Sequence, residues 1–127
     1  MSVLTLSVLP QRFAVCQLDA DERIPLELFR APFCSVTRTE SELSIVVPAE
    51  MVPAHWKAES GWRALMVQGP LDFSLIGILA SLSRTLAQAG VSIFAISTYD
   101  TDYLLVREAD LERAIAVLWE EGHVIES

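Results

Sequence analysis

The most regular hydrophobic pattern in the chain lies in its second half. One stripe of leucines recurs at i, i+4, i+7 and i+11, the spacing of one helix face: Leu75, Leu79, Leu82 and Leu86. Gly69-Pro70 precedes the stripe, Gly90 follows it, and Asp72 has the residue type of a helix N-cap. The pattern therefore predicts a helix that begins near Asp72 and ends at Gly90.

A second helix is predicted over residues 108–121, with acidic residues in its first turn and Gly122 as its stop. Its inward positions share an apolar character: Leu111, Ile115, Leu118 and Trp119. A short strand, His123-Val124-Ile125, is expected to follow. We expect His123, just past the helix end, to lie on the surface.

Strands are predicted before, between and after these helices. Residues 64–67 form an apolar run after Gly61, and residues 91–97 and 102–106 form two more, joined by a polar segment. The order β-α-β-β-α-β is that of the split βαβ unit, with four antiparallel strands and both helices on one face. Residues 93–96 and 104–106 are apolar without alternation, which indicates that both faces of the sheet are covered.

A faint internal repeat relates the two halves of the chain. Val47-Pro48-Ala49-Glu50 aligns with Val106-Arg107-Glu108-Ala109, and the same offset sets Leu65-Met66 against Val124-Ile125. The first copy has lost its long helix, and we expect an extra strand at residues 13–18 and a short helical piece at 26–30. The chain is thus expected to hold a degenerate unit, 1–60, and a complete unit, 61–127, with strand 62–68 a candidate for sharing between them.

Composition narrows the function classes. A chain of 127 residues fits one compact domain or two small ones, and a hydrophobic content of 52% indicates apolar surface that a partner chain covers. The formal net charge of −8 disfavours nucleic acid and anionic membranes as partners. No apolar run reaches the roughly 20 residues that span a bilayer, and no export signal is evident, so a cytoplasmic protein is expected.

The side chains that most often carry catalysis or hold metal ions are scattered. Cys16 and Cys34 have apolar neighbours, which favours buried free thiols over a disulfide, and His55 and His123 are isolated. Asp100 and Asp102 have no His, Lys or metal ligand nearby in sequence to divide acid and base roles. We therefore expect no enzyme, no catalytic residue, no metal site and no cofactor.

The polar segment between the two central strands is the strongest candidate for function. Six consecutive side chains all carry oxygen: Ser97, Thr98, Tyr99, Asp100, Thr101 and Asp102. Asp, Thr and Ser are also common in hairpin turns, where they bond nearby backbone amides. From the residues alone, a plain turn and a ligand site both stay open.

The segment GPLDFSLIGILASLSRTLAQAGVSIFAISTYDTDYLLV resembles the second half of small bacterial tandem ACT-domain proteins. It is also similar to the ACT pairs of CASTOR-type amino-acid sensors. The resemblance covers nearly the whole chain and is strongest over residues 61–127. It implies two ferredoxin-like (βαββαβ) ACT units side by side, with one extended antiparallel sheet and helices mainly on one face.

The resemblance also implies where a ligand binds. One wall would be the loop after the first strand of the complete unit: Gly69, Pro70, Leu71, Asp72 and Phe73. The other would be residues 97–102. Backbone amides after Asp72 suit a carboxylate, although Asp72 can also be only a helix cap, and Asp100 or Asp102 could accept an ammonium group. In the first half, Arg38-Thr39-Glu40-Ser41-Glu42 replaces the second motif, which puts an equivalent site there in doubt.

The sequence thus predicts a sensing module that binds a free amino acid or similar metabolite where two ACT units meet. A homodimer would cover the remaining apolar strand surface, and an unidentified regulated protein would receive the signal. The alternative is a protein-interaction or oligomerisation module without a ligand, in which the polar segment is only a turn.

Overall fold

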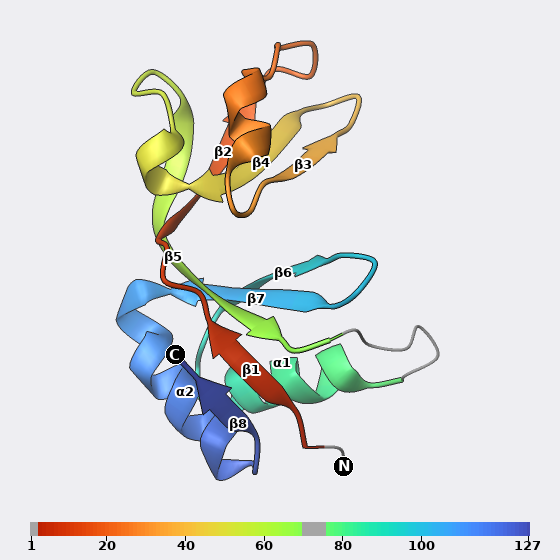
Figure 1. Cartoon of the computed structure of the whole chain (residues 1–127), viewed down its shortest axis with the longest axis vertical. Helices are drawn as coiled ribbons and strands as arrows, with labels where there is room; N and C mark the ends of the chain where they lie inside the picture. Colours follow the sequence, from red (N-terminus) through yellow and green to blue (C-terminus); the bar gives the residue numbers. More distant parts are fainter. Residues whose placement is uncertain (1–2, 70–75) are drawn as a thin grey trace. The chain divides into compact units, whose positions relative to one another are not determined.

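The chain is a mixed α+β protein. The computed structural model describes residues 3–69 and 76–127, and these contain eight strands, two α-helices and three short 3-10 helices (Figure 1). Backbone packing divides the chain into two compact units. Residues 1–10 and 63–127 form unit 1, and residues 11–62 form unit 2.

Unit 1 contains the segments predicted to form the βαββαβ unit and one strand more. Its strands are β1 (Thr5–Val8), the end of β5 (Lys57–Val67), β6 (Ile93–Ser97), β7 (Asp102–Arg107) and β8 (Val124–Glu126). Their lateral order is β6-β7-β5-β1-β8. Leu6 of β1 pairs with Val67 in an antiparallel ladder and with Ile125 in a parallel one.

The expectation of four antiparallel strands is therefore wrong for unit 1. β1 lies between β5 and β8, so β8 has a parallel neighbour. The apolar pattern of a strand indicates which of its residues point inward, but it does not indicate which other strand pairs with it. The N-terminal segment, distant in sequence, occupies that place.

Helix α1 (Ile78–Gln88) is shorter than the leucine stripe predicted. The helix was expected to begin near Asp72 with that residue as its cap, but its N-cap is Gly77, in the left-handed conformation at φ 83°. That backbone conformation interrupts a right-handed helix and is accessible chiefly to glycine. Leu75, the first leucine of the stripe, lies outside the described residues.

Helix α2 (Leu111–Glu120) follows a 3-10 turn, η3 (Glu108–Asp110). Ala114 and Leu118 are fully buried, at 0% exposure each. The prediction that Trp119 points inward is wrong, because its side chain is 68% exposed. Trp119 is one residue beyond Leu118, about 100° further around the helix, and this rotation turns its side chain away from the core that Leu118 enters.

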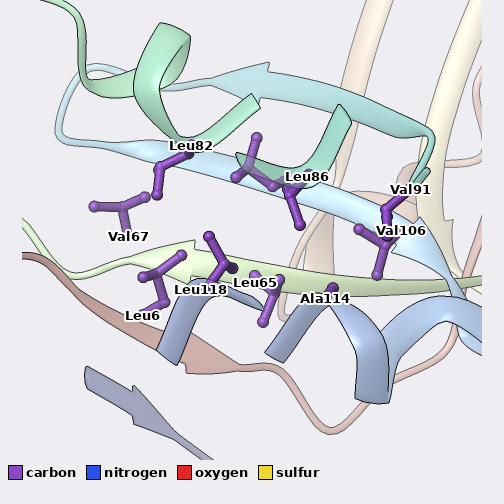
Figure 2. Packing of buried hydrophobic residues seen from close by; sticks show 10 residues of the cluster. Leu6, Leu65, Val67, Leu82, Leu86, Val91, Val106, Ala114 and Leu118 are labelled. Carbon is purple, nitrogen blue, oxygen red and sulfur yellow. The ribbon is translucent and has the colours of Figure 1, made fainter. Parts of the chain in front are cut away.

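The core of unit 1 joins both helices to the strands. Figure 2 shows Leu82 and Leu86 from α1 and Leu118 from α2 in one cluster of buried apolar side chains. On β5, Leu65 and Val67 belong to this cluster. Residues two apart on a strand share a face, so α1 and α2 pack against alternate strand positions.

The prediction for His123, which follows α2, is also wrong. It was expected at the surface, yet it is only 3% exposed. Its Nδ1 accepts a hydrogen bond from the backbone N–H of Leu4 at 3.1 Å, and the N–H of Val124 donates to the Leu4 carbonyl at 2.9 Å. The histidine is buried because β1 lies against the residues that follow α2, which the local sequence does not indicate.

Unit 2 consists of strands and short 3-10 helices. Its strands are β2 (Phe13–Leu18), β3 (Ser35–Arg38), β4 (Leu43–Pro48) and the first part of β5, in the order β3-β4-β2-β5. Residues 13–18 are a strand and η1 (Leu26–Arg30) is a short helical piece, so both predictions for this region are confirmed. The buried cluster comprises Ala14, Cys16, Leu28, Leu43, Ile45 and Val47.

The two predicted copies share a local sequence of elements. β4 ends at Pro48 and continues into η2 (Ala49–Met51), as β7 ends at Arg107 and continues into η3. After η3 the chain continues directly into α2, whereas Pro53 follows η2 and no α-helix forms in residues 11–62. After η2 only residues 52–56 precede β5, which begins at Lys57, so the chain has no room there for a helix of the length of α2.

Strand β5 is longer than the predicted 64–67 and runs from Lys57. Gly61 does not precede the strand but lies within it, at φ 85°. Nearby, the β2–β5 register shifts between the Phe13–Trp62 and Val15–Glu59 pairs. A glycine at positive φ is a common means of forming such a bulge.

Candidate functional site

The polar segment between β6 and β7 forms a tight hairpin turn. Ser97 pairs with Asp102 at the end of the ladder. The Thr98 N–H then donates to the Thr101 carbonyl at 2.8 Å, which leaves Tyr99 and Asp100 at the tip. Tyr99 is 81% exposed. The six predicted residues are thus brought together on one hairpin.

Several oxygen groups of this segment bond within the hairpin itself. The Ser97 hydroxyl donates to Asp102 Oδ1 at 2.6 Å, and the Thr98 hydroxyl donates to the Thr101 carbonyl at 3.2 Å. The Thr98 Oγ1 also accepts from the Thr101 N–H at 3.3 Å. These bonds are those of a polar turn that stabilises its own backbone.

Thr101 differs from its neighbours because it is buried, with 8% exposure. Its hydroxyl donates to the carbonyl oxygen of Val67, at the end of β5. This contact connects the hairpin to the strand that leads into Gln68 and Gly69. The structure therefore brings Thr101 beside Val67, two residues before Gly69, where the proposed other wall begins.

Of that proposed loop, Gly69 is described and exposed. Pro70, Leu71, Asp72 and Phe73 lie outside the described residues. The helix amides expected directly after Asp72 belong instead to the start of α1, after Gly77. A carboxylate bound by the helix N-terminus would therefore lie further along the chain than the sequence indicated.

Gln68 is a residue at this edge that sequence reasoning missed. Its N–H donates to the Thr5 carbonyl at 2.8 Å, and its Nε2 donates to the Ser7 hydroxyl at 3.2 Å and to the Glu126 carboxylate. The side chain thus joins β1 and β8 at the point where β5 ends. A glutamine between an apolar strand and a Gly-Pro pair gives little signal in a single sequence.

The described residues offer little for metal binding or for crossing a membrane. Among residues 3–69 and 76–127, no group of three or more His, Cys, Asp and Glu side chains is placed to hold a metal ion. No helix in that same part of the chain is long and apolar enough to cross a membrane. Cys16 and Cys34 are free thiols, and burial raises the pKa of each.

Comparison with known proteins identifies the family. Residues 57–120 match the family model described as an ACT domain. A second family model, described as an N-terminal domain, matches residues 11–55, which fall within unit 2. The chain belongs to the ACT-domain family.

Curated relatives include the "Cytosolic arginine sensor for mTORC1 subunit 1" of Bos taurus and of Rattus norvegicus. The bovine protein is 33% identical over 103 residues, and the match spans 72% of this chain and 31% of that protein. The rat protein is 34% identical over 95 residues, spanning 68% of this chain and 29% of that protein. The chain therefore matches less than a third of the length of these relatives.

Solved structures show the same fold. A crystallised protein from Agobacterium tumefaciens superposes with a TM-score of 0.91 at 36% identity, over 98% of this chain and 93% of that one. The ligand-free regulatory subunit of aspartate kinase from Thermus thermophilus superposes with a TM-score of 0.65 at 12% identity, over 94% and 99% of the two chains. The second likeness concerns the fold alone.

Proposed function

We propose that this chain is a regulatory module that senses a small molecule by reversibly binding a free amino acid or similar metabolite where two ACT units meet. The proposal includes no catalytic step. Membership of the ACT-domain family supports it, as does the similarity to proteins named as arginine sensors. It places the chain in the cytoplasm and in a homodimer, with a regulated protein as the receiver of the signal.

The observation that carries the proposal is the hydrogen bond from Thr101 to the Val67 carbonyl. It holds Thr101, next to the hairpin tip, against the end of β5. This supports a site in which hydroxyl and carboxylate groups of the hairpin would lie beside the loop that begins at Gly69. A zwitterion requires donors for its carboxylate and acceptors for its ammonium group. Asp100 would accept from the ammonium, Ser97 and Thr98 would contact the ligand by their hydroxyls, and Tyr99 would shape the room for its side chain.

The architecture proposed with this function is that of two tandem ACT-like units. Residues 1–60 would be the degenerate copy and 61–127 the complete one, with β5 shared. The recurrence of a strand followed by a 3-10 turn, β4–η2 and β7–η3, supports the repeat. The sheet would be extended, with its helices mainly on one face.

Thermal-shift screening of the free amino acids tests the proposal. A ligand at 100 times its dissociation constant adds about 2.7 kcal/mol of stability to the folded state, which raises the melting temperature measurably. The double variant Thr98→Ala/Asp100→Ala should lose that response. Glu120→Gln, which removes an exposed charge on α2, is the matched control and should keep it. A flat response of the folded wild-type protein to every amino acid would contradict the proposal.

The alternative is an interaction module without a ligand, and the internal hydrogen bonds of the hairpin favour it. Its docking surface would be the apolar strand face, to which the half-buried Ile96 of β6 contributes. Under this alternative, Ile96→Asp disrupts assembly in sedimentation experiments and no metabolite changes the stability. Under the sensing proposal, Thr98→Ala/Asp100→Ala abolishes the ligand response and leaves the assembly intact.

A further inference from the structure

Unit 2 contains a depression that the proposed ACT site does not use. Its volume is about 500 Å³, and its lining comes from the end of β2 with the segment after it, the β3–β4 turn, and the first residue of β5 with the two residues before it. Small-molecule pockets in proteins have volumes of roughly 300–1,000 Å³. The depression is therefore large enough for a metabolite the size of an amino acid.

The lining carries charges of both signs. Asp19 and Glu22 contribute carboxylates, while Lys57 contributes an ammonium group and His55 an imidazole. Lys57 pairs with Gln17 in the β2–β5 ladder, and this pairing fixes the position of the Lys57 backbone at the depression. A simple anion would meet the two carboxylates and a simple cation would meet Lys57, so neither matches the whole lining.

The lining also has an apolar part. Trp56 lies between His55 and Lys57 in sequence and lines the depression together with Leu18. Both side chains pack against the buried cluster of unit 2, so each has one side in the core and another toward the depression. An indole held in this way offers a firm surface for an apolar or aromatic group.

Hydrogen bonds to the backbone hold the segment that carries Asp19 and Glu22. The Glu22 N–H donates to the Asp19 carbonyl at 3.0 Å, which closes a turn. The Arg38 guanidinium donates to the Glu22 carbonyl at 3.2 Å and joins this turn to β3. The two carboxylates thus stand on a segment whose backbone is held from both sides.

Hydrogen bonds also hold the two other segments of the lining, the turn before β5 and the β3–β4 turn. The Trp56 N–H donates to the Pro53 carbonyl at 3.1 Å, in a turn just before β5. In the β3–β4 turn, the Thr39 hydroxyl oxygen accepts from the N–H groups of Ser41 and Glu42, at 3.1 Å each. Glu42 in turn accepts from Gln17 Nε2 at 3.2 Å, which connects this turn to β2.

We propose that this depression is a second small-molecule site, which takes a zwitterion bearing an apolar side chain. Lys57 and His55 bind its carboxylate, Asp19 and Glu22 bind its ammonium group, and Trp56 and Leu18 contact its side chain. Such a ligand satisfies both signs of charge, whereas an ion of one sign leaves the opposite set unpaired. The site lies wholly within unit 2 and does not depend on the site proposed at the β6–β7 hairpin.

Backbone amide NMR of the full chain, titrated with L-phenylalanine, L-leucine, L-glutamate and L-lysine, tests this site. At least one of the two apolar amino acids should shift the amides of residues 17–22, 41 and 55–57 in a saturable manner. N-acetyl-L-phenylalanine amide keeps the side chain but lacks both charges, and it should leave those amides unshifted. Shifts confined to residues 97–102 would support the hairpin site and overturn this one.

Two charge-removing variants sharpen the test. Asp19→Asn and Lys57→Gln should each weaken the binding about fivefold or more, since each removes one charge-assisted contact. Asp21→Asn and Arg30→Gln make the same kind of change at exposed positions of unit 2 outside the lining, and should leave the affinity unchanged. Equal weakening by the lining and control variants, or no shift of residues 17–22 and 55–57 by any of the four amino acids, would overturn the proposal.

Discussion

The two units of this chain bury their apolar residues in different ways. In unit 1, side chains from α1 and α2 complete a cluster with alternate residues of the strands. In unit 2, a smaller cluster forms between strands and the 3-10 helix η1. A strand face needs a covering layer, and a short helical piece with one buried leucine covers less than two full helices. The comparison indicates that unit 1 has the more extensive core, although the buried residues of unit 2 are equally inaccessible to solvent.

The largest effect is expected from the core of unit 1. Leu118→Ala removes a fully buried side chain between α2 and the strands and should lower the free energy of unfolding by about 3 kcal/mol. Chemical denaturation measures the loss. Trp119→Ala, one residue away and 68% exposed, is the control and should cost much less. Equal losses would show that α2 does not present the face described.

A smaller loss is expected in unit 2. Leu28, with 1% exposure, is the buried residue of η1, and Leu28→Ala should cost about 2 kcal/mol because the cluster it belongs to is smaller than that of unit 1. Leu26→Ala, at 79% exposure on the same 3-10 helix, should be nearly neutral. Amide hydrogen exchange should show faster exchange in residues 11–62 than in 63–127. If amide exchange in Leu28→Ala were equally fast in residues 11–62 and 63–127, the two units would open together.

The hairpin contact should contribute less again. Thr101→Val keeps the shape of the side chain but removes the donor to the Val67 carbonyl, which should cost about 1 kcal/mol in denaturant unfolding. Thr98→Val alters an exposed residue whose hydroxyl bonds only within the turn, as far as the described contacts show, and should cost less. A larger loss of stability for Thr98→Val than for Thr101→Val would show that the hydrogen bonds within the turn, rather than the contact with β5, constrain the hairpin most.

The smallest effect concerns the cysteines, both of which lie in unit 2. Burial raises the pKa of Cys16 above its ordinary value of 9.0. The unfolded chain then releases this proton at a lower pH than the folded one, so the contribution to stability is complete below pH 9 and is lost as pH rises above it. Unfolding measured between pH 7 and 10.5 should show a gentler alkaline decline for Cys16→Ala than for wild type. An unchanged slope would contradict the assignment.

Local patterns predicted much of the secondary structure. The leucine stripe identified α1, the apolar runs identified β6 and β7, and the first half yielded both the strand at 13–18 and the short helical piece at 26–30. These features depend on residues near one another in sequence, where side-chain period and turn chemistry act directly. The N-terminus of α1 was misplaced because an exposed glycine, Gly77, rather than a carboxylate marks it.

The candidate site was predictable only in part. Residue types alone placed six polar side chains on one hairpin, and the structure keeps them together there. The role of Thr101 was not predictable, because its partner is the carbonyl of Val67, 34 residues earlier in the chain. The depression of unit 2 was missed for the same reason, since its lining comes from three separate segments.

The sequence by itself determined the helices, most of the strands and the polar turn between β6 and β7, since each follows from the spacing of apolar and polar residues over a few turns. Only the tertiary structure decided that β1 enters between β5 and β8 and that His123 is buried, bonded to the N–H of Leu4 just before β1. Strand pairing joins backbone groups that every residue carries, so its specificity arises from the packing of whole elements. A single segment of sequence does not contain that information.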